Sequence, residues 1–396
     1  KKKFVISKKI CGIIKFHFKL YIKNSCLNSE SSLFIVIIAF FAPSNFPLQM
    51  IDYLIIGSGL AGISFSEMAL LNHKSILVMD NNSQNSSKIA GGLYNPVILK
   101  RFSEVGHAKE HLLIMNEFFV NLEKKLDCKV DYKLPILRKF FSIEEQNNWF
   151  LASDKVNLAP FLSTNLISRK YSFIDSPFGY GEVLQTGYVD TALLLEKYKA
   201  YLAKNNLFIE ESFDYALLKE EINSIRYKDI QARHIIFAEG FGMHSNPYFN
   251  NLPLDGTKGE LFIIKAPSLD LDVIMNTSVF ILPLGNDLYK VGATYNWADK
   301  TDLPTEEAKT ELVGKIKEII NCDFEIVKHF AGVRPTVKDR KSLVGTHLNH
   351  NSIHILNGLG TRGVMLGPAM AKALFENIEY QKPLENSIDI KRFNKR

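Results

Sequence analysis

The chain has 396 residues with 48 Lys and Arg against 42 Asp and Glu, which gives a formal net charge of +6. Residues 1–49 hold eight lysines and one glutamate, a balance of +7, so residues 50–396 have a net charge of −1. This near-neutral body lacks the basic excess of a nucleic-acid-binding protein, and we expect no DNA partner. Its isolated Cys128 and Cys322 argue against a disulfide framework and favour a reducing, cytoplasmic environment.

Residues 1–49 differ from the rest of the chain. The first methionine is Met50, and residues 33–42 form an uninterrupted apolar run. That run is short for a membrane span but long enough for the apolar region of a signal peptide. Our preferred interpretation is that residues 1–49 are a poorly ordered extension outside the working protein, with a signal peptide as the alternative. We expect no membrane span in residues 50–396, whose length favours two domains.

The first predicted unit of this body is a dinucleotide-binding fingerprint. Residues 51–62 read as a buried strand that runs into Gly57, Gly59 and Gly62 in the pattern G-x-G-x-x-G, followed by an apolar helix. The glycines allow a tight turn, close approach of a pyrophosphate, and close packing of helix on strand. A second apolar run ends at Asp80, at the distance where an acidic residue accepts hydrogen bonds from a ribose. The alternative, a glycine turn without a ligand, does not account for this order of elements.

The later elements alternate between helices and strands. We expect helices over residues 107–126, 190–204, 305–320 and from 369 onward, and strands over residues 232–240, 259–266, 279–283, 288–295 and 352–356. A small-residue loop follows Asp80 at residues 86–96, and a glycine loop occupies residues 358–363. The end of the chain therefore repeats the opening order of strand, glycine loop and helix.

Together these blocks resemble the D-amino-acid oxidase superfamily of FAD-dependent oxidoreductases, in its glycine oxidase and sarcosine oxidase branch. The resemblance covers nearly all of residues 50–396. It is carried by the fingerprint, by S-K-I-A-G-G at residues 87–92, by G-Y-V-D at 187–190, by G-V-R-P-T at 332–336, and by the closing glycine loop.

The resemblance implies an α/β protein with a Rossmann-like FAD-binding domain and an interleaved, smaller α+β substrate domain on a mainly antiparallel sheet. We expect the FAD-binding domain to comprise residues 50–100, 187–255 and 331–396. The substrate domain would then comprise residues 101–186 and 256–330.

The resemblance also implies the cofactor site. The expected FAD-binding residues are Gly57, Gly59, Leu60, Ala61, Gly62, Asp80, Ser87, Ala90, Gly91, Gly92, Gly240, Gly358, Gly360, Thr361, Arg362, Gly363 and Val364. Backbone amides of the last loop would lie near the pyrimidine end of the flavin, where reduction places negative charge.

Three residues are candidates for catalysis. Arg334 resembles the arginine that holds the substrate carboxylate in glycine oxidases, and a guanidinium grips a carboxylate with two hydrogen bonds; a structural ion pair is the alternative. Tyr295 resembles a pocket residue, or is an ordinary cross-strand aromatic. Lys290 corresponds to a lysine that assists oxygen reduction in sarcosine oxidases. In a regular strand Lys290 and Tyr295 face opposite sides, so both can reach the pocket only if the strand is interrupted.

Two departures from the family pattern affect the expected chemistry. Phe280 stands where glycine oxidases have a pocket tyrosine, which puts glycine in doubt as the substrate. The region of Arg334 has no cysteine where sarcosine oxidases attach their flavin, so we expect non-covalent FAD. The expected reaction is hydride transfer from the C–N carbon of a small amine or amino acid to flavin N5. The imine is then hydrolysed, and oxygen or another acceptor reoxidises the flavin.

Three alternatives remain open. The related domain of a bifunctional tRNA-modifying enzyme oxidises a carboxymethylaminomethyl uridine and has a similar G-x-R-G loop, although a near-neutral body disfavours tRNA. A zinc hydrolase using His107 and His111 in an H-x-x-E-H motif is a remote alternative, and we expect no metal. A flavin-binding protein without turnover is the third.

Overall fold

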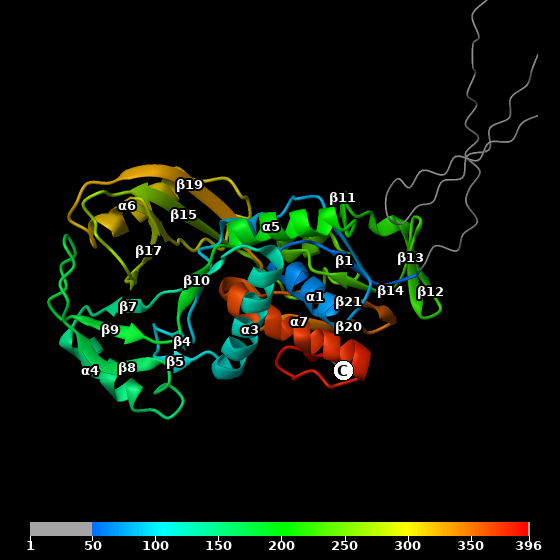
Figure 1. Cartoon of the computed structure of the whole chain (residues 1–396), viewed down its shortest axis with the longest axis horizontal. Helices are drawn as coiled ribbons and strands as arrows, with labels where there is room; N and C mark the ends of the chain where they lie inside the picture. The colour runs from blue at the N-terminus through cyan, green and yellow to red at the C-terminus, as the bar shows by residue number, and fades with distance from the viewer. Residues whose placement is uncertain (1–49, 395–396) are drawn as a thin grey trace, which may run out of the picture.

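Residues 50–394 are described in the computed structural model, and they form two lobes (Figure 1). The first lobe is built on an eight-stranded sheet. Its strands are β11 (Phe208–Glu210), β2 (Ile76–Asp80), β1 (Ile51–Ile56), β14 (Ile230–Phe237), β13 (Ser224–Tyr227), β12 (Leu218–Glu221), β21 (His350–Asn357) and β20 (Leu343–His347). Five of these strands are adjacent and parallel to one another, in the order β11, β2, β1, β14 and β21. Parallel strands joined by helices are the expected consequence of the opening fingerprint.

The alternation of side chains along β1 separates the two faces of this sheet. Tyr53 and Ile55 belong to a core that they share with helices α1 (Leu60–Leu71), α3 (Ala108–Leu126) and α7 (Gly363–Tyr380). Leu54 and Ile56 point to the other face, into a core with β12, β13 and the chain after β14. Both faces are therefore buried, which explains why β1 reads as a continuous apolar run.

The second lobe is built on another eight-stranded sheet, mainly antiparallel, with β16 and β7 as its parallel pair. Its strands in order are β19 (Glu325–Arg334), β15 (Thr257–Lys265), β18 (Leu288–Gly292), β17 (Phe280–Gly285), β16 (Ile274–Asn276), β7 (Ile136–Lys139), β9 (Tyr180–Val183) and β8 (Leu162–Ile167). Helix α6 (Glu306–Lys317) packs Leu312 and Ile316 into its core, and α4 (Ile143–Ser153) lies on β8 and β9.

The remaining elements lie around these two sheets. They are α2 (Ser86–Ile89), α5 (Thr191–Lys204), the three-stranded sheet β3 (Leu93–Tyr94), β10 (Gly187–Val189) and β6 (Asp131–Lys133), the hairpin β4 (Val97–Ile98) and β5 (Ser103–Glu104), and the 3-10 turns η1 (Tyr215–Leu217), η2 (Gly240–Ser245), η3 (Gly360–Arg362) and η4 (Ile390–Phe393). All strands of the first sheet fall in the segments expected to bind FAD, whereas β19 crosses the expected boundary at residue 330. The exact domain division stays a prediction.

Several element boundaries differ from the sequence prediction, and two of the differences lie close to the cavity. Strand β18 ends at Gly292, three residues before the expected end at residue 295. Helix α7 begins at Gly363, six residues earlier than expected, although its first turns contain Gly367 and Pro368. A Cβ atom at Gly367 would lie 2.7 Å from the Ser64 hydroxyl oxygen of α1. Close packing of α7 on α1 therefore favours glycine where helix propensity disfavours it.

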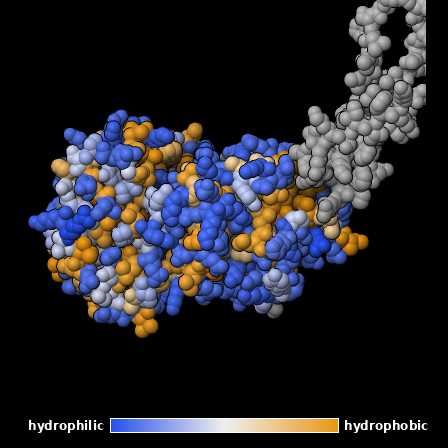
Figure 2. Space-filling view, in the orientation of Figure 1, coloured by the Kyte–Doolittle hydropathy of each residue, from blue (hydrophilic) through white to orange (hydrophobic). Residues whose placement is uncertain are grey.

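The predicted extension at residues 1–49, including its apolar run, lies outside the described residues. Of the helices formed by residues 50–394, none combines the length and the apolar character that crossing a membrane requires. On the face drawn in Figure 2, polar and apolar side chains are interspersed over both lobes.

Candidate cofactor and substrate site

A cavity of about 590 Å³ lies between the two lobes, and residues of both sheets line it. From the first lobe it receives the ends of β1, β2 and β14, and from the second lobe residues of β15, β17, β18 and β19. A cavity of this size at the carboxyl ends of parallel strands is the usual place for a nucleotide cofactor in such sheets.

Two of the three fingerprint glycines, Gly57 and Gly59, line one end of this cavity. Gly57 has φ +104°, and a Cβ atom there would lie 2.4 Å from the carbonyl oxygen of Ala238. A Cβ atom at Gly62 would lie 1.9 Å from the carbonyl oxygen of Gly57. Neither position therefore admits a side chain without moving the backbone. This turn brings the N-terminus of α1 to the cavity, where its amides suit a phosphate.

Asp80 lies at the end of β2 and lines the same part of the cavity. Its Oδ2 accepts hydrogen bonds from the Ser58 backbone N–H at 2.5 Å and from the Ser58 hydroxyl at 2.7 Å. Its Oδ1 accepts the Asn82 N–H at 2.6 Å. An ionised carboxylate has about four acceptor positions, so capacity for a ribose hydroxyl remains. These bonds hold the carboxylate against the glycine turn.

The cavity brings together most of the predicted cofactor residues. Those that line it are Gly57, Gly59, Leu60, Ala61, Asp80, Ser87, Ala90, Gly91, Gly92, Gly240, Gly360, Thr361, Gly363 and Val364. Gly62, Gly358 and Arg362 do not line it. Gly62 instead shapes the turn, and Gly358 has φ +70° where the chain leaves β21. The segments at both ends of the body thus meet at one cavity, which fits the extended shape of FAD.

Sequence reasoning missed several lining residues, which come from the chain after β11 and β14. Phe213, Tyr215 and Glu239 lie at the fingerprint end of the cavity. Glu239 accepts hydrogen bonds from the Asn246 side chain at 2.7 Å and from the Tyr215 hydroxyl. Burial raises the pKa of the Glu239 carboxyl above its ordinary value. The only local signal for this group was the A-x-G ending of the strand at Gly240.

Arg334 ends β19 and lines the opposite end of the cavity. Its guanidinium lies over the backbone of Gly259 on the paired strand β15, where a Cβ atom would be 1.9 Å from Nη2. It donates a hydrogen bond to the Thr294 carbonyl oxygen at 3.3 Å and lies 4.7 Å from the centre of the Tyr295 ring. Burial lowers the pKa of Arg334 below its ordinary value. Within residues 50–394 no carboxylate forms an ion pair with it, contrary to the structural alternative.

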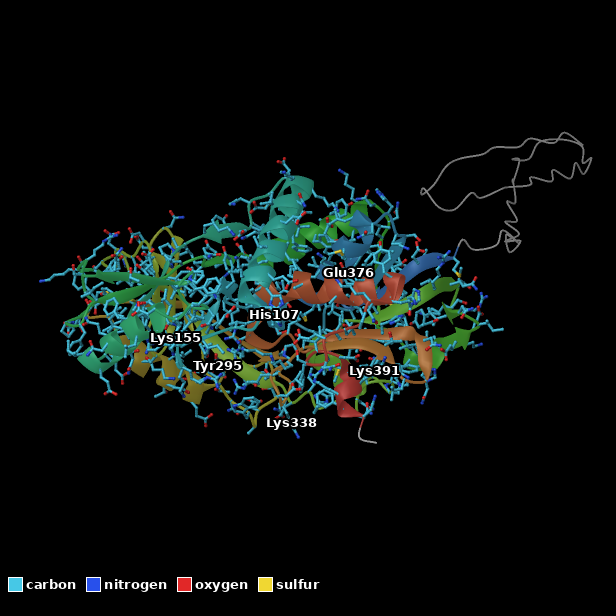
Figure 3. All side chains as sticks on the ribbon, turned by 90° about the horizontal axis from the view of Figure 1, so that it is seen from below. His107, Lys155, Tyr295, Lys338, Glu376 and Lys391 are labelled. Carbon is cyan, nitrogen blue, oxygen red and sulfur yellow. The ribbon has the colours of Figure 1, made fainter. Side chains whose placement is uncertain are left out.

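Tyr295 and Lys290 are both near this end, because β18 stops between them. Tyr295 lines the cavity from the chain after Gly292, and Figure 3 shows it close to the junction of the lobes. Lys290 does not line the cavity. Its ammonium donates a hydrogen bond at 3.2 Å to the carbonyl oxygen of Ala90, which does line the cavity. Burial lowers the pKa of the Lys290 ammonium. Of these two candidates, Tyr295 thus lines the cavity and Lys290 contacts only a residue of its wall.

Phe280 is the residue that stands where glycine oxidases have a pocket tyrosine. It lines the cavity, and its ring covers Gly91, where a Cβ atom would be 2.8 Å from Cζ. No cysteine occurs among the residues that line the cavity. Attachment of FAD without a covalent bond remains a prediction.

The H-x-x-E-H segment lies elsewhere, at the start of α3. The rings of His107 and His111 are 6.0 Å apart, and His107 Nε2 lies 3.4 Å from a carboxylate oxygen of Glu385. Burial lowers the pKa of His111. Across the described residues 50–394, His, Cys, Asp and Glu side chains do not gather in threes or more at a position that could hold a metal ion. A zinc site thus gains no support from this geometry.

Comparisons with known proteins agree with this arrangement. A glycine oxidase of Bacillus subtilis is 22% identical over 224 residues, which cover 52% of this chain and 60% of that protein. The tRNA 5-methylaminomethyl-2-thiouridine biosynthesis bifunctional protein MnmC of Campylobacter jejuni subsp. doylei is 26% identical over 158 residues, or 38% of this chain and 25% of that protein. The chain thus spans less than two thirds of each of these curated relatives.

Solved structures extend the similarity over the whole fold. Glycine oxidase from Bacillus cereus superposes with a TM-score of 0.67 at 17% identity, covering 84% of this chain and 96% of that one. Iminodiacetate oxidase from Chelativorans sp. BNC1 gives a TM-score of 0.69 at 15% identity, covering 85% and 98%. The family model described as "FAD dependent oxidoreductase" matches residues 52–377. This chain therefore belongs to the DAO family of FAD-dependent oxidoreductases, as its sequence motifs predicted, and FAD is its cofactor.

Proposed function

We propose that this oxidoreductase oxidises the C–N bond of a small amino acid or secondary amine. The observation that carries the proposal is Arg334, a desolvated guanidinium on the cavity wall that has no carboxylate partner within residues 50–394. Relatives and fold neighbours named as glycine oxidase and iminodiacetate oxidase support this substrate class. FAD, when bound, supplies the hydride acceptor of the reaction.

The residues around Arg334 explain how an amine would be oriented. The guanidinium is held between the Gly259 backbone and the Tyr295 ring, so its planar face is fixed before a substrate arrives. A carboxylate bound by two hydrogen bonds would have its neighbouring carbon directed into the cavity. Phe280 and other apolar lining groups lower the polarity there, which favours the neutral amine that oxidation requires.

The test is anaerobic bleaching of the flavin absorbance of the purified protein by small amino acids and N-methyl amino acids. Bleaching by any of them supports amine oxidation and names the substrate class. A yellow protein that no small amine bleaches contradicts this proposal. A protein that takes up no FAD would contradict the cofactor assignment as well.

Replacing Arg334 with methionine should lower kcat/KM for a carboxylate-bearing amine by about 10²–10³-fold, because two charged hydrogen bonds are lost. The loss should fall mainly on KM, and FAD content should stay unchanged. Arg226→Met on β13 is the control, since that arginine pairs with Glu221 at 2.6 Å on a different strand edge. Equal kinetics in the Arg334 variant and the control would exclude the carboxylate-binding role.

Lys290 is proposed to promote reoxidation by oxygen, because its buried ammonium can stabilise negative charge that develops on oxygen. Lys290→Met should slow reoxidation by about 10²-fold in stopped-flow measurements, with anaerobic reduction unchanged. In the unmodified protein the rate should decrease as pH rises through the lowered pKa of Lys290, where the ammonium loses its proton. Slow, pH-independent reoxidation of the unmodified protein would favour a different electron acceptor.

A tRNA substrate is the second candidate, and one observation favours it. The exposed aromatic rings of Tyr295, which lines the cavity, and of Trp297 both lie next to arginines: the Arg334 guanidinium is 4.7 Å from the Tyr295 ring centre, and the Arg340 guanidinium is 6.0 Å from the Trp297 ring centre. Stacking surfaces beside positive charge suit an unstacked base. Bleaching by an oligoribonucleotide that contains 5-carboxymethylaminomethyluridine, but not by small amines, would establish this candidate.

A further inference from the structure

We propose that Asn276 is a second substrate-binding residue, whose side-chain N–H groups donate to an oxygen at the far end of the group attached to the substrate nitrogen. The substrate is then a secondary amine with an amide or carboxylate on that side. This assignment rests on the proposed function and specifies its substrate class. Asn276 lines the cavity, and no motif of the sequence singles it out.

The strand pairing places Asn276 on the face of the second sheet that borders the cavity. Phe280 of β17 lies directly opposite Asn276 of β16, and Gly292 of β18 lies opposite Phe280. Leu261 of β15 continues the row beyond Gly292. Residues directly opposite each other on paired strands project from the same face. All four line the cavity, and so does Gly259, two positions before Leu261.

Arg334 lies at the other side of this row, because its guanidinium covers Gly259. Three strand spacings and two residues separate Gly259 from Asn276, which is about 16 Å between backbones in a flat sheet. The Asn276 side chain, about 3 Å long, and a hydrogen bond of about 3 Å at each end leave about 7 Å for a ligand that contacts both residues. That length corresponds to about two residues of extended chain, and a bare amino acid provides only one.

The side-chain amide of Asn276 has a defined orientation. Its Oδ1 accepts a hydrogen bond from Nη1 of Arg138 at 3.2 Å, and since a guanidinium only donates, the amide oxygen must face Arg138. Arg138 is itself fixed, because Glu145 accepts from its Nε at 2.9 Å and its Nη2 at 2.7 Å, and the Thr277 carbonyl oxygen accepts from its Nη1 at 3.0 Å. Arg138 is therefore a positioning residue that turns the amide nitrogen of Asn276 away from itself.

The amide nitrogen of Asn276 is available to a ligand. Within residues 50–394 no acceptor contacts its two N–H groups, and the atom is not buried. The hydroxyl of the next lining residue, Thr277, is used inside the turn, where it donates to the Val279 carbonyl oxygen at 2.9 Å. Phe280, opposite Asn276, offers only an apolar ring. The donors of Asn276 are thus oriented, unpartnered and on the cavity wall.

These donors select a chemical class. Two neutral N–H groups bind a carbonyl or carboxylate oxygen, and they gain nothing from an apolar or cationic end. Arg334 accounts for the carboxylate beside the amine. The matching substrates are glycines whose nitrogen carries a short group that ends in an amide or a carboxylate.

The experiment uses the FAD-containing protein and three unreactive ethers with one skeleton: isobutoxyacetate, carbamoylmethoxyacetate and diglycolate. Their distal ends have equal numbers of heavy atoms and are apolar, neutral with an acceptor oxygen, and anionic. Dissociation constants are measured from perturbation of the oxidised flavin spectrum. N-isobutylglycine, N-carbamoylmethylglycine and iminodiacetate are the reactive counterparts, tested by anaerobic bleaching.

The variants are Asn276→Asp, Asn276→Leu and Arg138→Met. The control is Asn116→Leu, because Asn116 does not line the cavity and its Oδ1 accepts from Lys133 at 2.6 Å on the surface of α3. Asn276→Asp is the sharpest variant: it keeps an oxygen for Arg138 and replaces the donors with a second oxygen of the same size.

Relative to isobutoxyacetate, we expect Asn276→Asp to weaken carbamoylmethoxyacetate about 10-fold and diglycolate about 100-fold, because an acceptor then faces an acceptor. Asn276→Leu should weaken both about 5- to 10-fold on the same scale. Arg138→Met lets the amide rotate, so it should reduce the same discrimination while isobutoxyacetate binding stays unchanged. Asn116→Leu should alter none of the three dissociation constants.

Equal effects of Asn276→Asp on all three ethers, no effect on any of them, or no binding of any ether to the unmodified protein overturns the proposal. If the ethers respond as expected but no amine bleaches the flavin, the role of Asn276 stands and amine oxidation fails. If the amines bleach the flavin with no discrimination that depends on Asn276, amine oxidation stands and the role of Asn276 is refuted. The ether that loses more affinity in Asn276→Leu identifies the natural end group as amide or carboxylate.

Discussion

Replacing Gly62 with valine is expected to abolish FAD uptake. A Cβ atom at this position would lie 1.9 Å from the carbonyl oxygen and 2.9 Å from the carbonyl carbon of Gly57. Both contacts are to backbone atoms, so relief requires the first turn of α1 to move away from β1. That movement would withdraw the helix amides from the place where a pyrophosphate binds.

The measurement is the ratio of flavin to protein absorbance after purification and after incubation with FAD. We expect the FAD content of the variant to be less than about one tenth of that of the unmodified protein, because moving the first turn of α1 removes several hydrogen bonds from backbone amides to the pyrophosphate. Gly314→Ala is the matched control: Gly314 is exposed on α6, and a Cβ atom there meets nothing within 4 Å. It should retain FAD and gain up to about 1 kcal/mol of stability. Full FAD content in the Gly62 variant would contradict the assigned phosphate site.

Replacing Lys258 with methionine is expected to destabilise the protein and loosen the chain that carries Tyr295. Lys258 is fully buried on β15. Its ammonium donates hydrogen bonds to a carboxylate oxygen of Asp299 and to the Leu303 carbonyl oxygen, both at 2.5 Å, and to the Thr301 hydroxyl at 3.2 Å. Because these acceptors all belong to the segment between β18 and α6, one cation fixes the loop that follows Tyr295.

Removing one member of a buried ion pair costs about 3–5 kcal/mol, and we expect a loss of this size in denaturant unfolding. Limited proteolysis should then cut within residues 293–305. Lys309→Met is the control, because Lys309 forms an exposed pair with Glu306 at 3.4 Å that is worth about 0–1 kcal/mol. Unchanged stability and unchanged protease resistance in the Lys258 variant would show that the loop is held by other contacts.

The same loop gives the stability a defined pH dependence. Hydrogen bonding by Lys258 lowers the pKa of the Asp299 carboxyl to about 2, below its unfolded value of about 3.9. A lowered carboxyl pKa stabilises the folded state above the unfolded pKa, and this contribution is lost as pH falls toward the folded pKa. The unmodified protein should lose this contribution between about pH 4 and pH 2, and Lys258→Met should make the contribution smaller, because the pKa of Asp299 in the folded state then returns toward its unfolded value.

Local sequence was sufficient for the cofactor end of the site. The order of strand, Gly57, Gly59, Gly62 and Asp80 depends on residues within about one βαβ unit, and inside that unit a Cβ atom at Gly62 would meet the carbonyl oxygen of Gly57. The family resemblance placed the closing glycine loop at the same cavity, and the structure brings Gly360 and Gly363 there. Residues close together in the sequence determine such turns, so the turns can be predicted without knowledge of the fold.

Contacts between segments that are distant in the sequence could not be predicted in this way. Helix α7 includes Gly367, which packs closely against Ser64 of α1, and no local pattern in the sequence records that contact. Phe213 and Tyr215 line the cavity only because β11 and η1 lie beside the end of β2. Likewise, Lys258 reads in the sequence as an ordinary strand lysine, and only the tertiary structure surrounds it with Asp299 and Leu303.

The sequence by itself determined the family, the cofactor and the identity of Arg334 as the residue to examine, because short-range motifs encode backbone turns and charged groups. Tertiary structure decided which charges are left without partners. Arg138 and Arg334 are both partly buried arginines, yet Arg138 lies against Glu145, whereas Arg334 lies between the Gly259 backbone and the Tyr295 ring with no carboxylate partner within residues 50–394. Whether a charge is satisfied depends on what the fold places within a few ångströms of it, and that property distinguishes a structural ion pair from a binding site.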